Sequence, residues 1–82
     1  MTDAYIIFGE YFENGNFLSV PMFVCYLQFE ADLFVSALNK REPPFWSKVI
    51  KWFGGDSLVP SDIVFSVKTH EVLSFIHHHN NP

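Results

Sequence analysis

The pattern of apolar and polar positions in the first third of the chain predicts a β-hairpin. Residues 4–12 are rich in aromatic and β-branched side chains, a composition that is typical of strands. The dipeptide Asn14-Gly15 follows, and it favours a type I′ turn because both central residues of that turn take positive φ. A two-residue turn at this point sets Phe12 opposite Phe17, and the second strand then covers residues 17–27.

The middle of the chain predicts two helices. Between residues 29 and 41 apolar side chains recur at helical spacing, and they include Phe29, Leu33, Ala37 and Leu38. Residues 44–53 predict a second, shorter helix, because Pro44 suits a first helical position and Gly54 suits the position after the last one. Its apolar arc consists of Phe45, Trp46, Val49, Ile50 and Phe53.

The last third predicts two more strands, over residues 62–68 and 71–77, with a turn at residues 69–70. The element order is then β-β-α-α-β-β. Strands grouped at both ends of a helical middle predict an α+β fold, a four-stranded antiparallel sheet with two short helices on one face. The 82 residues are enough for a single compact domain, and residues 77–82 are expected to form a frayed tail.

Both faces of the predicted sheet are apolar. In the first hairpin, one face would present Tyr5, Ile7, Tyr11, Leu18, Val20 and Met22, and the other would present Ile6, Phe8, Phe12, Phe17 and Phe23. Pro21 lacks an N–H group and therefore belongs at a sheet edge or a β-bulge. Two short helices can cover only one face. We therefore expect another protein, or a second copy in a homodimer, to bury the other.

Composition and charge narrow the class of protein. The chain is 49% hydrophobic and 17% charged, which indicates a globular domain and excludes intrinsic disorder. A net charge of -4 argues against a dedicated nucleic-acid binder, which needs clustered lysines and arginines. Cys25 has no second cysteine to pair with, and no apolar run is long enough to span a membrane. We therefore expect a cytoplasmic protein.

Candidate chemistry is sparse. Glu10 and Glu13 lie three apart on a strand, so they point to opposite faces and cannot act as a pair. Residues 77–79 are three consecutive histidines, and a metal site there would need Cys25 and His70 to converge with them. We expect no enzyme activity and no cofactor. Two alternatives stay open, namely a small metal-binding protein and a peripheral membrane protein that uses the amphipathic helix 44–53.

The excess of aromatic residues, 18% of the chain, favours a non-catalytic protein-binding domain, because aromatic side chains are enriched in interface cores. The expected contact surface lies on the first hairpin and consists of Tyr5, Glu10, Tyr11, Phe12, Glu13 and Phe17. Its acids would steer a basic target, such as the nucleic-acid-binding groove of a nuclease or effector. By analogy of size and character, such chains are typical of phage or mobile-element inhibitors, including anti-CRISPR and immunity proteins.

Overall fold

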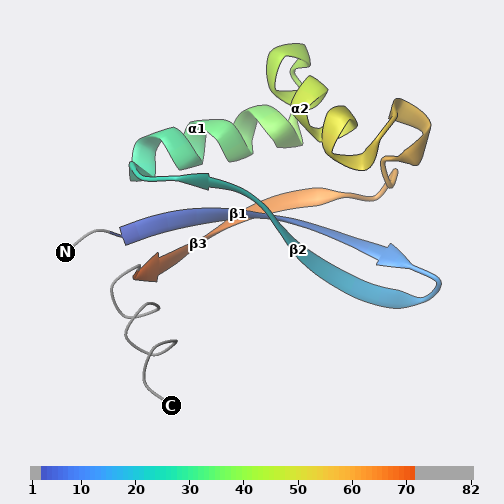
Figure 1. The fold of residues 1–82 in the computed structure, drawn as a ribbon, viewed down its shortest axis with the longest axis horizontal. Coiled ribbons are helices and arrows are strands. Elements are labelled where there is room, and N and C mark those ends of the chain that lie inside the picture. The colour runs from blue at the N-terminus through green and yellow to red at the C-terminus, as the bar shows by residue number, and fades with distance from the viewer. Residues whose placement is uncertain (1–2, 72–82) are drawn as a thin grey trace.

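The computed structural model describes residues 3–71, and within this range the chain folds as an antiparallel sheet covered by helices. Its elements in order are β1 (Asp3–Glu13), β2 (Asn16–Cys25), α1 (Gln28–Asn39), α2 (Pro43–Phe53), the short 3-10 helix η1 (Asp56–Leu58) and β3 (Val64–Glu71). The strand order is β2-β1-β3, so β1 is central. Both α-helices lie on the same side of the sheet (Figure 1). The predicted α+β class is confirmed.

The predicted hairpin between β1 and β2 is confirmed, and its register is as predicted from the turn to the Gly9–Val20 pair. Asn14 and Gly15 have φ of 53° and 82°, as a type I′ turn requires. Across the turn, Phe12 pairs with Phe17. The β1 strand is paired on both sides, because β3 pairs with it antiparallel on the side opposite β2.

A β-bulge in β2 corrects one predicted side-chain position. Ile7 pairs with Phe23 and Phe8 pairs with Pro21, so Met22 is the extra residue. Pro21 therefore lies both on an edge strand and at the bulge, as its missing N–H group predicts. The extra residue reverses the alternation beyond it, and this brings Phe23 to the helix side of the sheet. The placement of Phe23 on the other face was wrong for this reason.

The turn predicted at residues 69–70 is wrong, because β3 runs through it without interruption. Thr69 pairs with Tyr5 and His70 pairs with Ala4 of the central strand. Neither threonine nor histidine favours the positive φ of a tight turn, and a β-branched residue suits a strand. The described sheet therefore has three strands in place of the predicted four. The second part of the fourth strand and the frayed tail, residues 72–82, lie outside the described residues.

Both helices form close to their predicted bounds, but α1 turns a different face to the sheet. Ala37 and Leu38 are buried as expected, whereas Phe29 and Leu33 are 62% and 63% exposed. The helix instead packs through the side of Phe34, whose ring stacks on Phe23 of β2 with centroids 5.1 Å apart. Phe29 and Leu33 therefore form an exposed apolar pair on the side of the domain away from the sheet.

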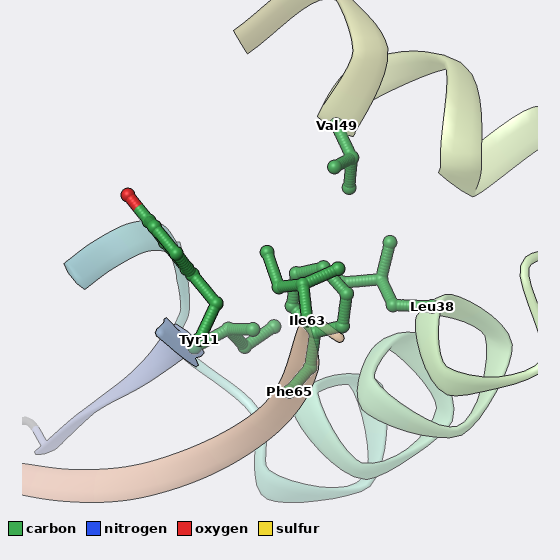
Figure 2. Close-up of a cluster of buried hydrophobic side chains, with 6 residues drawn as sticks. Tyr11, Leu38, Val49, Ile63 and Phe65 are labelled. Atoms are coloured by element: carbon green, nitrogen blue, oxygen red, sulfur yellow. The ribbon is translucent and has the colours of Figure 1, made fainter. Parts of the chain in front are cut away.

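The core lies between the sheet and the two helices. Six buried side chains form it, namely Ile7, Tyr11, Leu38, Val49, Ile63 and Phe65 (Figure 2). The ring of Tyr11 meets Phe53 of α2 edge-on, with centroids 5.8 Å apart, while its hydroxyl points away from the cluster (Figure 2). Helix α2 packs against this core through its apolar side, on which Val49 is buried and Phe45, Trp46 and Phe53 are half-buried. Among the described residues, no helix combines the length and apolar character that crossing a membrane requires.

Candidate protein-binding surface

The sheet face turned away from both helices, here called the open face, keeps large apolar side chains in contact with solvent. Strand alternation and register place on it Ile6, Phe8, Glu10, Phe12, Phe17, Ser19, Val24, Val64, Ser66 and Lys68. Phe12, Phe17 and Val64 are 61%, 57% and 55% exposed. These three side chains lie toward the hairpin end of the sheet, so that end exposes two aromatic rings and a valine to solvent.

The Asn14-Gly15 turn fixes the two phenylalanines beside each other. Their rings meet edge to face, with centroids 5.3 Å apart and an interplanar angle of 63°. The backbone N–H of Phe12 also donates to Asp62 Oδ2 at 2.9 Å, which ties the end of β1 to the segment before β3. The backbone that carries the aromatic pair is therefore held in place, so burying the pair against a partner would cost little conformational entropy.

Glu10 binds both neighbouring strands from the centre of the open face. Ser66 Oγ of β3 donates to Glu10 Oε1 at 3.0 Å, and Ser19 Oγ of β2 donates to Oε2 at 3.3 Å. The carboxylate is thereby held in one position next to the exposed aromatic pair. It supplies a negative charge at a fixed position, which would interact with a partner during its approach to the open face.

Lys68 places a positive charge on the same face, further along β3. Its Nζ lies 4.6 Å from the centroid of the Phe8 ring, within the range of a cation–π interaction. Phe8 and Ile6 are half-buried beside it. The open face therefore combines an apolar end with Glu10 and a second region with Lys68.

The six predicted contact residues divide between the two faces of the sheet. Glu10, Phe12 and Phe17 lie together on the open face, and Glu13 is exposed beside the turn. Tyr5 and Tyr11 point to the helix side, because they alternate with those residues along β1. Tyr11 is only 8% exposed and belongs to the core. The structure thus brings together one half of the predicted set on a solvent-exposed surface.

Sequence reasoning missed the contribution of β3 to this surface. The sequence pattern pairs residues 62–68 with a later strand and does not indicate that they pair with β1. In the structure Val64 pairs with Glu10 and Ser66 pairs with Phe8. A strand pattern gives no indication of which distant strand is its neighbour, so only the apolar character of Val64 was visible in the sequence.

Within residues 3–71, the remaining chemically active side chains do not assemble into a metal site. Burial raises the pKa of the Cys25 thiol, and the nearby Glu30 carboxylate raises it further, so the thiol is less ionised than an exposed one at neutral pH. Among the residues that the structure describes, no three histidine, cysteine, aspartate or glutamate side chains gather as metal ligands would. Residues 77–79 of the alternative metal site lie outside that part of the chain.

Comparison with known proteins gives no match. No protein-family model matches the chain, and the comparisons with curated proteins and with solved structures found no match either.

Proposed function

We propose that this chain is a small non-catalytic protein-binding domain that contacts its partner through the hairpin end of the open face. The observation that supports this most directly is the exposure of Phe12 and Phe17, at 61% and 57%, on a face that neither helix covers. Complete burial of a phenylalanine side chain stabilises by about 1.5–3 kcal/mol, so covering the exposed part of each ring would contribute roughly 1–2 kcal/mol. Interface hot spots reach values of this size.

Charge favours a partner with a basic surface. Glu10 lies beside the aromatic pair on the open face, and Asp62 binds the backbone of Phe12. Glu13 follows Phe12 at the turn, where its side chain is exposed on the opposite face. Carboxylates at this end of the sheet would attract lysines and arginines during encounter and raise the association rate. The nucleic-acid-binding groove of a nuclease or another effector is a surface of this kind. Blocking it would make the chain an inhibitor like those of phage or mobile elements, anti-CRISPR-like or immunity-like, acting in the cytoplasm.

A second copy of the chain is the other candidate for this face. Glu10 and Lys68 are opposite charges on the same surface, and a two-fold pairing could set each against the other in the partner copy. Light scattering at tens of micromolar distinguishes the two occupants. A homodimer would have about twice the 9.5 kDa of the chain, whereas a monomer leaves the open face to a foreign protein.

The test of the proposal is affinity capture from the source cells, followed by mass spectrometry. Wild type is compared with the double variant Phe12→Ala/Phe17→Ala, with Phe29→Ala as a control of equal exposure on α1. We expect one protein to be captured by wild type and control and lost with the double variant, because only the double variant removes the exposed aromatic pair. Equal capture by the double variant, with circular dichroism showing it folded, would contradict the proposal. Loss with Phe29→Ala instead would place the contact on α1.

A further inference from the structure

A groove runs between the edge strand β2 and helix α2, and along β2 it reaches Val24, whose side chain belongs to the open face. Its volume is about 500 Å³, and its lining consists of Met22, Phe23, Val24, Phe34, Lys48, Lys51 and Trp52. The apolar residues of β2 and α1 line one side of the groove, whereas α2 contributes Trp52 and both lysines. The groove is therefore apolar along β2 and α1, and it combines an aromatic ring with positive charge along α2. It lies apart from the exposed aromatic pair of the open face.

Local structure builds this groove. The bulge in β2 turns both Met22 and Phe23 toward the helices, and Phe23 stacks on Phe34 to form an apolar wall. On α2, Lys48 and Lys51 are three positions apart and therefore share one side of the helix. The opposite side of α2 is anchored in the core, which keeps the lysines pointing into the groove region.

We propose that this groove binds an acidic peptide segment of a partner protein. A large apolar side chain of the segment would rest on Phe34 and Trp52, and flanking aspartates or glutamates would pair with Lys48 and Lys51. Trp52 is 45% exposed and is the aromatic residue of α2 that the core leaves available. This contact is separate from the open face and adds a second binding surface to the domain.

Charge complementarity selects the occupant. The chain carries a net charge of -4, and residues 1–39 contain acids but no lysine or arginine. Arg41 already donates from Nη2 to the Ser61 carbonyl at 2.9 Å and lies over the Trp46 ring. Lys48 and Lys51, by contrast, are exposed and line the groove. A basic groove on an acidic domain attracts acidic ligands there and repels them elsewhere.

The groove suits a peptide better than a lipid surface. An amphipathic helix binds lipid by inserting its apolar face, but most of the apolar side of α2 already packs against the core, with Val49 completely buried. A peptide would depend mainly on side-chain contacts, because the bulge and the missing N–H of Pro21 interrupt the β2 edge. Specificity would then come from the acidic and apolar side chains of the segment.

Selection from a random peptide library displayed on phage, with the full chain immobilised, tests the assignment. We expect the selected peptides to combine two or more acidic residues with one aromatic or large aliphatic residue. The affinity of the best peptide should fall at least about tenfold with Lys48→Glu/Lys51→Glu, and it should weaken as salt rises. Lys40→Glu, a charge reversal on an exposed lysine outside the groove, should leave the affinity unchanged.

Three results would overturn the groove assignment. One is selection without acidic enrichment, and another is equal affinity for the Lys48→Glu/Lys51→Glu variant. The third is a selection that enriches no peptide while wild type binds phosphatidylserine vesicles and the Lys48→Glu/Lys51→Glu variant does not. That result would make the groove a lipid site. Phe12→Ala/Phe17→Ala should retain the peptide, because it leaves the groove intact. The proposed peptide site in the groove can therefore be refuted without refuting the proposed contact on the open face, and the contact on the open face can likewise be refuted alone.

Discussion

Asn39 should be one of the most stabilising polar residues of this domain, although it is a surface residue at the end of α1. Its Nδ2 donates to the carbonyl oxygen of Phe65 at 3.0 Å, and its Oδ1 accepts from the Phe65 N–H at 2.8 Å. The side-chain amide thus acts as a short additional strand against β3. Phe65 itself is only 5% exposed and belongs to the core, so the two hydrogen bonds also tie α1 to the sheet beneath it.

The magnitude follows from the two bonds that Asn39→Ala would remove. Each contributes about 1 kcal/mol net, and leaving a partly buried backbone group unsatisfied costs a further fraction of that. Alanine has a higher helix propensity than asparagine, and this offsets about 0.5 kcal/mol of the destabilisation. We therefore expect a net loss of about 2 kcal/mol, a large share of the roughly 4–12 kcal/mol that stabilise a domain of this length.

Urea unfolding followed by circular dichroism measures this loss. The midpoint should fall by about 1–2 M with an unchanged slope, since the m-value of a small domain is near 1 kcal/mol per molar urea or somewhat above. Ser36→Ala, an exposed substitution on the same helix, is the matched control. Asn39→Asp should fall between the two, because it keeps the acceptor for the Phe65 N–H and loses the donor to its carbonyl. A difference of less than about 0.5 kcal/mol between Asn39→Ala and the control would refute the reasoning.

Three further outcomes test other parts of the structure. Gly15→Val should lower the free energy of unfolding by about 1 kcal/mol or more in the same urea assay, because a β-branched residue is strained at φ 82°, while a Cβ there would meet no atom within 4 Å. Gly9→Ala should cost about 1–3 kcal/mol, because its Cβ would lie 2.5 Å from Met22 Sδ; a stability equal to wild type would show that Met22 moves aside freely. Cys25 should react with iodoacetamide more slowly in the folded than in the urea-unfolded chain at about pH 8, because its raised pKa leaves less thiolate, and Glu30→Gln should speed the reaction.

The parts of the fold that local chemistry determines could be predicted from the sequence. The Asn14-Gly15 turn specifies its own φ values and therefore the register of the hairpin. The short helix α2 starts with Pro43 and Pro44 and ends at Phe53, directly before Gly54, which takes the left-handed conformation of a C-cap. In each case the residues that decide the outcome are adjacent in the chain.

The parts that depend on distant contacts could not be predicted. Pro21 allows either a sheet edge or a bulge, and only the observed register shows the extra residue at Met22 that reverses the side to which Phe23 points. The pairing of β3 with β1 extends the strand through residues 69–70, where the sequence pattern predicts a turn. Likewise, Tyr11 and Phe12 are neighbouring aromatic residues that point to opposite faces of β1. Only the position of the helices shows which of the two is buried.

The central claim is that the hairpin end of the open face contacts a partner protein, and NMR chemical-shift mapping tests it most directly. The captured partner is added to the isotope-labelled chain, and shifts are followed at every backbone amide. We predict the largest changes at Phe12, Phe17 and Val64, with small changes at Phe29 on the far side of α1. Shifts confined to α1, or to the lysine-lined side of α2, would contradict the claim.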